Sequence, residues 1–489
     1  MKKVLIANRG EIACRIIRTL RKEGIASVAV YHHEDRSAPH VTMADEAVLI
    51  EADVPTAAYL DQQQLVTIAS RTGADAVHPG YGFLAENATF AERVEAAGLV
   101  FIGPDPTVIR LMGDKIRARD FAGKQGVPVA PSAVQDGSLE EFIARATAVG
   151  FPLLLKAAAG GGGKGMRIAY NATELAANAA LAAGEARRYF GDGRIYAERY
   201  IEQPRHIEVQ VLGDGAGNVI HLHERECSLQ RRYQKIVEET PATNLPAATR
   251  EVICDAAVRL TAAAHYRNAG TVEFVLAPDG NFYFLEVNTR LQVEHPVTEK
   301  VFGIDLVREQ LRIAAGHGLP FSQDELHPRG HAIECRICAE EPEREFRPAT
   351  GRIGILRLPE GEHVRFDSGI REGQAVTAAF DSMLAKLIAW GPTRTEAAAA
   401  LERALHETVI LGVPTNVDYL ARIMRHPEFL AGRLHTGFLL NHASDLAPPP
   451  LSAAEEAAVL TAAALADDDF RRATFAVPEP YASIGHWRN

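Results

Sequence analysis

The sequence predicts a multidomain protein that combines α/β and α+β architecture, and three observations support this prediction. The chain has 489 residues, enough for three domains of ordinary size. Its N-terminal part alternates short apolar runs with helical patterns, as expected of a parallel sheet with crossover helices. The rest mixes alternating strands, a hairpin and further helices, so a second kind of architecture follows the first.

The composition is that of a globular protein and argues against polyanionic partners. The 52 Lys and Arg against 63 Asp and Glu give a net charge of −11, which disfavours binding to nucleic acid or to an anionic membrane. The nearly apolar run at residues 457–466 is too short to span a bilayer, and residues 4–7 are too short for a signal-peptide core. The five cysteines are scattered, as in a reducing compartment, so we expect a cytoplasmic protein.

The first domain is predicted to span residues 1–113. Apolar residues recur on one face of a helix that follows the first strand, namely Ile12, Ile16, Ile17 and Leu20. Strands are expected at residues 4–7, 27–31, 75–78 and 99–102. Strands separated by helices indicate a Rossmann-like parallel sheet.

A weak dinucleotide fingerprint lies inside this domain. Gly80, Gly82 and Ala85 have the required spacing, but they do not follow the first strand of the sheet. We therefore favour a structural or substrate-lining loop over an NAD site.

The second domain, predicted for residues 114–325, contains a glycine-rich loop. Residues 151–156 form a predicted buried strand that ends in Lys156, and four consecutive glycines, 160–163, follow. Glycines let backbone N–H groups approach phosphate oxygens closely. A flexible linker is the alternative, but the loop directly follows a buried strand. We favour a mobile flap that covers phosphates, within a lid of about residues 131–204.

A predicted hairpin at residues 271–290 brings acidic side chains together. Asp279-Gly280 is a signal for a two-residue turn, which would place Glu273 directly opposite Glu286. Facing carboxylates repel unless a cation lies between them, and Asn288 shares their face. This donor set suits Mg²⁺ or Mn²⁺ bound with nucleotide phosphates, and a solvated pair of glutamates is the alternative.

Three further segments carry polar side chains. Arg290, Gln292 and Glu294 could hold a small anion while a carboxylate removes its proton. Residues 205–211 alternate, with His206 on the polar face, and an edge strand with a solvated face stays equally open. Residues 224–235 are rich in basic side chains, and a salt-bridged surface strand remains an alternative there.

A third domain of mixed α/β structure is predicted for residues 326–446. Strands are expected at residues 331–337, 354–358 and 376–379, and a helix at 395–404. A lone C-x-x-C at Cys335 and Cys338 makes a zinc site improbable, because no second pair exists. Prolines 448–450 mark a boundary, and residues 447–489 are predicted to be an extension or the start of a linker with an Ala-rich helix.

Several motifs between residues 1 and 440 resemble those of biotin carboxylase, a family within the ATP-grasp superfamily. They are Asn8-Arg9-Gly10-Glu11-Ile12-Ala13, His78-Pro79-Gly80-Tyr81-Gly82-Phe83-Leu84, Met112-Gly113-Asp114-Lys115, the loop after Lys156, residues 286–299 from Glu286 through His295-Pro296, and Glu334-Cys335-Arg336. The resemblance implies an ATP-grasp domain and an ATP-dependent ligase. It implies that bicarbonate is phosphorylated by Mg·ATP to carboxyphosphate, which then carboxylates N1′ of biotin.

The resemblance also implies roles for individual residues. Nucleotide contacts are implied for Lys115, Lys156, the backbone of Gly162 and Gly163, Glu198, Arg199, Tyr200, Ile201, His206, Gln230 and Tyr233. Glu273, Glu286 and Asn288 would ligate two Mg²⁺ or Mn²⁺ ions, and Lys235, Arg290, Gln292 and Val293 would bind bicarbonate. Glu294 would be the general base, Arg336 would stabilise the biotin enolate, and Tyr81 would line the biotin site.

Departures from the family pattern shape the remaining expectations. Tyr233 stands where the family usually has His or Asn, which puts the nucleotide contact there in question. The biotin-attachment pattern Met-Lys-Met is absent, so biotin is expected on a separate carrier protein or domain, with a carboxyltransferase subunit as a further partner. Residues 480–489 resemble the start of the joining segment in acyl-CoA carboxylase α-subunits, which makes truncation from a longer chain plausible.

The family commonly forms homodimers, and we expect one here. An ATP-grasp ligase acting on another carboxylate is the alternative function. A non-catalytic nucleotide-binding subunit is disfavoured, because the acidic and basic positions of the family pattern are intact except at 233.

Overall fold

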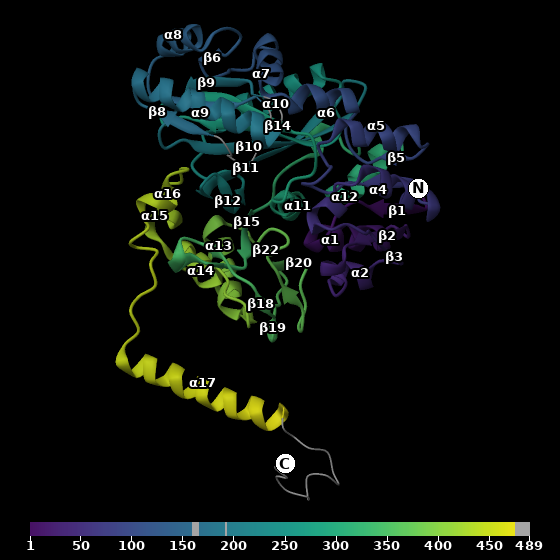
Figure 1. Cartoon of the computed structure of the whole chain (residues 1–489), viewed down its shortest axis with the longest axis vertical. Coiled ribbons are helices and arrows are strands. Elements are labelled where there is room, and N and C mark those ends of the chain that lie inside the picture. Colours follow the sequence, from purple (N-terminus) through teal and green to yellow (C-terminus); the bar gives the residue numbers. More distant parts are fainter. Residues whose placement is uncertain (159–165, 191–192, 475–489) are drawn as a thin grey trace, which may run out of the picture. The chain divides into compact units, whose positions relative to one another are not determined.

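The computed structural model describes residues 1–158, 166–190 and 193–474 of the chain (Figure 1). It divides into two units, Met1–Leu446 and Ala447–Asn489. The predicted phosphate contacts of Gly162 and Gly163, and the predicted joining segment at residues 480–489, lie outside the described residues. Every helix among the described residues is too short or too polar to cross a bilayer.

A five-stranded parallel sheet begins the first unit, so the Rossmann-like prediction is confirmed. Its strand order is β3 (Glu46–Leu49), β2 (Ala26–Tyr31), β1 (Lys3–Ile6), β4 (Ala76–His78) and β5 (Val100–Phe101). Val4 and Ile6 pack with the predicted apolar face of α1 (Gly10–Lys22). Leu5 packs on the opposite side, with α4 (Gln62–Arg71) and α5 (Ala88–Ala96).

The order of the strands determines where the topological switch point of the sheet lies. The sheet runs outward in one direction from β1 and in the other from β4, so the topological switch point lies between these two strands. The strand β3 was not predicted, because it is short and only half-buried. The remaining helices of this region are α2 (Pro39–Met43), α3 (Pro55–Ala58), α6 (Pro106–Gly113) and α7 (Lys115–Lys124).

A smaller antiparallel sheet lies in the predicted lid region. Its order is β6 (Ser132–Val134), β9 (Ile195–Arg199), β7 (Leu153–Ala157) and β8 (Arg167–Ala169), and it packs with α8 (Leu139–Val149) and α9 (Ala172–Phe190). Leu153 and Leu155 of β7 join the core with these helices. Leu154 and Lys156 alternate with them and line a cavity instead. The predicted buried strand before the glycine loop is therefore confirmed.

An antiparallel sheet of eight strands forms the centre of the first unit. Its order is β14 (Phe282–Asn288), β13 (Arg267–Leu276), β10 (Arg205–Asp214), β11 (Val219–Arg231), β12 (Gln234–Thr240), β15 (His331–Cys338), β22 (Met383–Gly391) and β20 (Val364–Ser368). The pairing of β12 with β15 carries the sheet across the boundary predicted near residue 325, and that boundary stays a prediction.

The edge-strand alternative for residues 205–211 is wrong. The strand β10 lies between β11 and β13 and pairs with both. Its polar face is buried as well as its apolar face: Glu208 and Gln210 have no exposed surface, and His206 is 8% exposed. A buried polar face at the centre of a sheet requires partners, which the site supplies.

The hairpin of β13 and β14 has the predicted pairing but a different turn. Ala277 and Asn281 pair across a three-residue loop, and Gly280 adopts a positive φ of 87°. A β-bulge at Leu285 then shifts the register by one, so Glu273 does lie opposite Glu286. The two-residue turn prediction is wrong because Pro278 takes part in the loop, and the bulge compensates for the extra residue.

The C-terminal part of the first unit packs helices against β15 and β22. Its main helices are α13 (Arg394–Glu407) and α14 (Val417–Arg425), and Leu401 and Leu420 are central to this core. The prediction of strand at residues 376–379 is wrong beyond Val376, where β21 (Ala375–Val376) ends. The other elements here are β16 (Glu340–Glu341), β17 (Arg347–Pro348), β18 (Gly351–Arg352), β19 (Ile355–Arg357), β23 (Val409–Leu411), α15 (Pro427–Leu430) and α16 (Phe438–Asn441).

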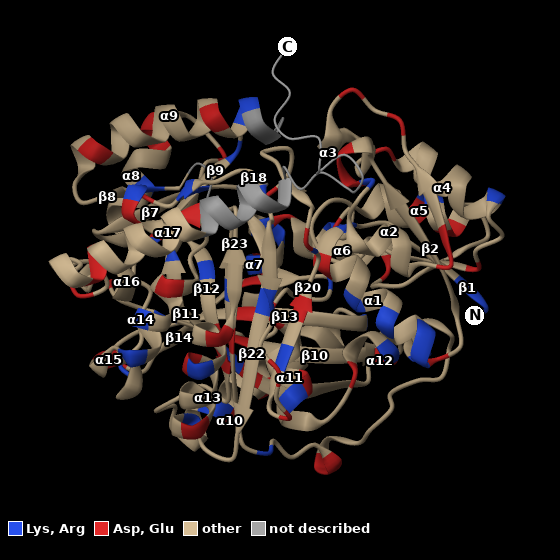
Figure 2. Cartoon of the chain, turned by 90° about the horizontal axis from the view of Figure 1, so that it is seen from below, with Lys and Arg blue, Asp and Glu red and all other residues tan. Residues whose placement is uncertain are grey.

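Three further helices lie between strands of this sheet in the sequence. They are α10 (Ala247–Ala263) after β12, α11 (His295–Phe302) after β14, and α12 (Leu306–Ala314) after α11. Figure 2 shows acidic and basic residues interspersed along these elements. In the second unit, α17 (Ala453–Thr474) matches the predicted Ala-rich helix.

Candidate active site

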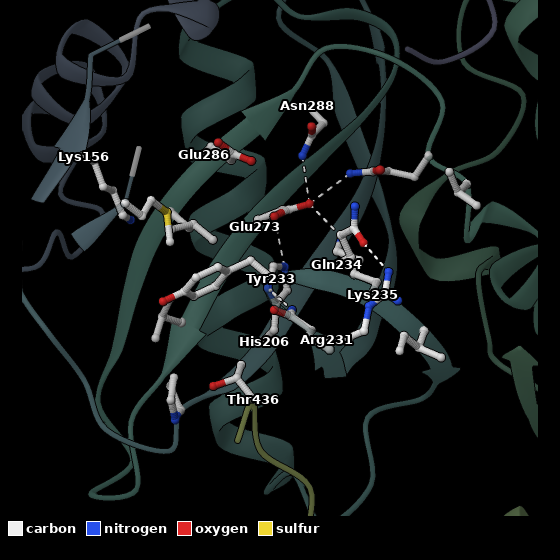
Figure 3. Close-up of a pocket in the computed structure, with 18 of the residues that line it drawn as sticks. Lys156, His206, Arg231, Tyr233, Gln234, Lys235, Glu273, Glu286, Asn288 and Thr436 are labelled. Carbon is white, nitrogen blue, oxygen red and sulfur yellow. Dashed lines mark hydrogen bonds and ion pairs between the residues drawn. The ribbon is translucent and has the colours of Figure 1, made fainter. Parts of the chain in front are cut away.

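Most of the residues predicted for the site line one cavity of about 520 Å³ in the first unit. The cavity receives side chains from the lid sheet and the eight-stranded sheet (Figure 3). The loop after β4 also lines it, through Tyr81 and Gly82. The predicted residues that line it are Tyr81, Lys115, Lys156, Glu198, Arg199, Tyr200, Ile201, His206, Gln230, Tyr233, Lys235, Glu273, Glu286, Asn288, Arg290, Gln292, Val293 and Arg336. Glu294 does not line it, but its carboxylate touches Lys235 and Arg336.

Two lysines bring positive charge to the lid side of this cavity. Nζ of Lys156 lies 2.5 Å from Oε1 of Glu198, and Nζ of Lys115 lies 3.0 Å from Oε2 of Glu286. Burial opposes the charge of Lys115, but Glu286 outweighs it and raises the pKa of the lysine. Burial likewise opposes ionisation of Glu198, and Lys156 with Arg119 holds the pKa of that carboxyl below its usual value. Both lysine side chains line a cavity large enough for a nucleotide.

The acidic pair of the hairpin faces the same cavity (Figure 3). Oε1 of Glu273 accepts hydrogen bonds from Lys235 at 2.8 Å, Asn288 at 2.8 Å and Gln292 at 3.0 Å. Burial raises the pKa of Glu273, but Lys235 and His206 outweigh this effect and hold the pKa well below its usual range. The predicted repulsion between the two glutamates is relieved by cationic side chains on each of them. The two carboxylates and the Asn288 oxygen form a hard donor set that fits Mg²⁺.

Lys235 is the centre of the buried charge network. Its Nζ lies 2.5 Å from Glu208, 2.8 Å from Glu273 and 2.6 Å from Glu294. Burial lowers the pKa of Lys235, yet the three carboxylates raise it well above its usual value. The lysine is therefore charged, and it holds three carboxylates in fixed positions.

Glu294 is a buried carboxylate between two cations. Oε1 accepts from Lys235 at 2.6 Å and Oε2 from Arg336 at 3.0 Å. Burial raises the pKa of Glu294, but Lys235, Arg336 and Arg225 together lower it below its usual value. Glu294 is therefore ionised at neutral pH, which is the state that a general base needs.

The predicted anion cluster is held by its own hydrogen bonds. Arg290 donates to Oδ1 of Asn288 at 2.9 Å, to Oε1 of Gln292 at 3.0 Å and to Oε2 of Glu86 at 2.9 Å. The Val293 carbonyl accepts from Nζ of Lys386 at 2.7 Å. The cluster thus presents a guanidinium and an amide to the cavity in a fixed arrangement.

Three of the predicted nucleotide contacts, Arg199, Gln230 and Tyr233, differ in how their side chains are held. The Arg199 guanidinium donates to the carbonyls of Val149 and Phe151, so its side chain is engaged at the start of β7. Nε2 of Gln230 lies 2.9 Å from Nδ1 of His206 and helps to hold that ring. The Tyr233 side chain is 46% exposed and occupies the turn between β11 and β12.

Several residues of this network were not predicted from the sequence. Glu208 lies two residues after His206 and so on the same face of the alternating segment 205–211, and this alternation is the signal that could have found it. Arg225, which donates to Glu208 at 2.6 Å, was placed only in a basic segment. Glu238 accepts from Arg336 at 2.5 Å, and burial raises the pKa of Glu238 to about 7. Cys335 and Cys338 are free thiols.

The fold and the cavity together define the class of protein. A lid sheet with Lys156 faces a large antiparallel sheet that carries a carboxylate–carboxylate–amide set, and a second lysine, Lys115, lies at the junction. This arrangement is that of an ATP-grasp ligase.

Comparison with family models then identifies the family. Residues 1–109 match "Biotin carboxylase, N-terminal domain", residues 114–322 match "Carbamoyl-phosphate synthase L chain, ATP binding domain", and residues 334–441 match "Biotin carboxylase C-terminal domain". The chain belongs to the biotin carboxylase family, which is a family of ATP-dependent ligases.

Individual relatives agree with this assignment. A biotin carboxylase of Nostoc sp. is 48% identical over 440 residues, covering 89% of this chain and 98% of the relative. The mitochondrial methylcrotonoyl-CoA carboxylase subunit alpha of Rattus norvegicus is 47% identical over 448 residues, covering 91% of this chain but 63% of the relative. The chain thus spans less than two thirds of that longer subunit.

A solved structure shows the same fold. The biotin carboxylase domain dimer of Hydrogenobacter thermophilus 2-oxoglutarate carboxylase, in complex with MgADP, ADP and bicarbonate, superimposes with a TM-score of 0.89 at 45% identity. The match covers 92% of this chain and 99% of that chain.

Proposed function

We propose that this chain carboxylates N1′ of carrier-bound biotin with bicarbonate, at the expense of ATP and through carboxyphosphate. The observation that carries the proposal is the position of Glu294. An ionised, fully buried carboxylate lies between Lys235 and Arg336, beside an anion cluster and next to a cavity with two lysines for phosphates. A nucleotide-dependent reaction that activates a small acidic anion needs these parts together.

The nucleotide would occupy the lid side of the cavity. Lys115 and Lys156 would exchange their glutamate partners for phosphate oxygens, while Glu198, Tyr200 and Ile201 lie on the strand and loop that border the cavity. Glu273, Glu286 and Asn288 would hold Mg²⁺ or Mn²⁺, which would supply neutralisation of phosphate charge. His206, with Gln230 behind it, would help to orient the phosphates.

Bicarbonate would bind where Arg290, Gln292, Lys235 and the Val293 backbone converge. Glu294 in its present contacts is a weak base, because two cations stabilise its negative charge. A bound bicarbonate would draw Lys235 and Arg290 toward its own oxygens, and the carboxylate would then accept a proton more readily. Arg336 would pass from Glu294 and Glu238 to the developing negative charge on the biotin ureido group.

More specifically, this chain would be the biotin carboxylase component of an acyl-CoA type carboxylase in the cytoplasm. The likeness to methylcrotonoyl-CoA carboxylase subunit alpha supports an acyl-CoA acceptor, and the likeness to 2-oxoglutarate carboxylase supports a different acceptor. A biotin carrier protein or domain and a carboxyltransferase would be partners, and a homodimer is supported by the dimer of the Hydrogenobacter domain.

The test is bicarbonate-dependent ATP hydrolysis with free biotin as acceptor. We expect phosphate release to require bicarbonate and to rise with biotin, and a ligase for another carboxylate would ignore both. Release of phosphate at an equal rate without bicarbonate would reject the proposal.

Glu294→Gln tests the base directly. We expect carboxylation to fall by about 100-fold or more, because a positioned base contributes that much, while ATP binding is retained. Glu362→Gln, at an exposed position before β20, is the matched control and should retain full activity. Full turnover in Glu294→Gln would remove this residue from the role.

A further inference from the structure

Glu334 is a buried acidic residue to which the proposed function gives no role. Its side chain has no exposed surface, and neither Oε1 nor Oε2 has a hydrogen-bond partner among the described residues. It lies in β15 two residues before Arg336, so the two side chains face the same side of the sheet. An ionised carboxylate that is buried without partners costs far more free energy than a neutral carboxyl group, so the environment of Glu334 favours its neutral form.

Glu238 lies directly opposite Glu334, in the neighbouring strand β12. Its Oε1 accepts a hydrogen bond from Nε of Arg336 at 2.5 Å, whereas its Oε2 has no partner among the described residues. Side chains at directly opposite positions of an antiparallel ladder are close enough to interact. Three of the four carboxyl oxygens of this pair therefore lack a hydrogen bond, and a single proton on the pair would supply a donor that links two of them.

The charges around the pair favour Glu334 as the residue that carries this proton. Three cations lie near, and each already contacts another carboxylate: Arg336 contacts Glu238, Lys235 lies 2.6 Å from Glu294, and Lys386 lies 3.3 Å from Glu11. Burial raises the pKa of Glu334 well above its usual value, although the charge of Lys386 opposes this rise. Two neutral groups complete the surroundings, because burial raises the pKa of the Cys227 thiol and lowers that of the His295 ring at the start of α11.

A neutral acid at this position matters because Arg336 has to leave Glu238 in the proposed function. Arg336 lines the cavity, and Glu238 is completely buried behind it. Removing one partner of a buried ion pair leaves an uncompensated charge, which is strongly unfavourable. An O–H group opposite Glu238 would keep a hydrogen bond on that carboxylate while the guanidinium is elsewhere, and so would lower the cost of the movement.

We propose that Glu334 is a positioning residue that acts on Arg336 through Glu238. As a neutral carboxylic acid it donates its O–H to Oε2 of Glu238, and it stabilises that carboxylate when Arg336 turns to the developing negative charge on biotin. The proton stays on Glu334 throughout, so Glu294 remains the only base of the reaction. The inference rests on the proposed function and adds one residue to it.

Two substitutions of Glu334 separate this role from a purely structural one. Glutamine keeps the size and an N–H donor, whereas leucine keeps only the size. The quantity to measure is the ratio of free-biotin carboxylation to bicarbonate-dependent ATP hydrolysis without biotin, because only the first reaction needs Arg336 to move. We expect this ratio to fall at least about tenfold in Glu334→Leu and to change less than about threefold in Glu334→Gln. A folding defect lowers both activities together and leaves the ratio as it is.

Infrared spectroscopy detects the proton itself. At neutral pH the difference spectrum between the unaltered protein and Glu334→Gln should contain the C=O stretch of a protonated carboxyl group, and D₂O should shift it. Glu360→Leu, at an exposed position that does not line the cavity, is the matched control and should change neither the ratio nor this band. Equal falls of the ratio in both Glu334 variants, an unaltered ratio in Glu334→Leu, or absence of the band would overturn the inference. If the unaltered protein shows no bicarbonate-dependent ATP hydrolysis, the proposed function fails instead, and the band still decides whether Glu334 is neutral.

Discussion

Lys386 is a lysine with no exposed surface, and it lies directly behind the anion cluster. Its Nζ donates to the Val293 carbonyl at 2.7 Å and lies 3.3 Å from Oε1 of Glu11. Glu334, another buried carboxyl group, has no hydrogen-bond partner among the described residues; burial raises its pKa well above the usual value, and the charge of Lys386 opposes this rise. Lys386 therefore fixes the peptide that precedes Glu294 and balances buried acidic groups.

We predict that Lys386→Met destabilises the protein by about 3 to 5 kcal/mol, because it leaves buried carboxylates without their cation. Adding Glu11→Gln should recover at least about 1 kcal/mol, since burial raises the pKa of Glu11 and the charges of Lys386 and Arg18 oppose this rise. The free energy of unfolding in urea, measured for both single variants and the double variant, gives the coupling. Strictly additive losses would show that the two side chains do not stabilise each other.

Residues of this kind explain what the sequence could and could not reveal. Glu273, Glu286 and Lys156 could be predicted as site residues, because each lies near a local sequence signal such as a turn or a glycine run. Lys386, Glu238 and Arg225 were not, because their partners lie on strands far away in the sequence. The expected roles of Val293 and Arg336 came from the resemblance to the family, whereas the anion cluster of Arg290, Gln292 and Glu294 was already indicated by the local sequence.

The turn between β11 and β12 has an unusual backbone conformation for its residue types. Arg231 pairs with Gln234, so Arg232 and Tyr233 form a two-residue turn with φ of 49° and 67°. Such turns favour Asn and Gly, because other L-residues are strained at positive φ. Tyr233 nevertheless places its ring at the cavity, where the family usually has His or Asn.

We predict that Tyr233→Gly raises the free energy of unfolding by about 1 kcal/mol and weakens ATP binding by about 1 kcal/mol, roughly fivefold. The first effect relieves backbone strain, and the second removes an aromatic surface from the cavity. Arg232→Asn is the matched control: it lies in the same turn but does not line the cavity, so stability should rise and ATP affinity should stay constant. Unchanged ATP affinity in Tyr233→Gly would mean that the ring makes no nucleotide contact. Thermal unfolding and isothermal titration measure the two quantities.

For the hairpin of β13 and β14, the predicted pairing is correct but the predicted turn is not. The Asp279-Gly280 signal located the reversal, and the pairing of Glu273 with Glu286 is confirmed. The signal could not show that Pro278 enlarges the loop or that a bulge at Leu285 restores the register. Similarly, the alternation at residues 205–211 located β10, but a central strand with a buried polar face looks like an edge strand in sequence alone.

At the scale of the whole molecule, unfolding is linked to proton uptake by buried histidines. Burial lowers the pKa of His78 to about 3, and Nδ1 of His78 accepts the Gly80 N–H at 3.0 Å. An unfolded histidine has a pKa of about 6.5, so between these values the unfolded chain binds one proton more. Stability therefore rises with pH across this window and is lost as pH falls, by up to about 1.4 kcal/mol per pH unit for this group.

We predict that His78→Asn flattens the pH dependence of stability between pH 5 and 6.5 by up to about 1.4 kcal/mol per pH unit. Asparagine keeps an acceptor for the Gly80 N–H and does not titrate. Urea unfolding at several pH values measures the slope, and His33→Asn, at an exposed position, is the control. An unaltered slope in His78→Asn would show that His78 is not the group whose protonation accompanies unfolding.

The global arrangement was only partly predictable. The parallel N-terminal sheet follows from local alternation of strands and helices. The continuity of the eight-stranded sheet could not be predicted in this way. The strand β22 is buried on both faces and shows no alternation of polar and apolar residues, and it pairs with strands that are distant in the sequence.

The pairing of β12 with β15 determines how this molecule can be divided. Lys235 precedes that junction and Arg336 follows it, yet both hold the same carboxylate of Glu294. A chain severed between them would carry a bare strand edge, open to unrelated polypeptides, and half of its charge network would lack counterions. Exchange of modules during evolution is therefore compatible with fusion around Met1–Leu446, whereas a breakpoint inside it would dismantle the reaction centre.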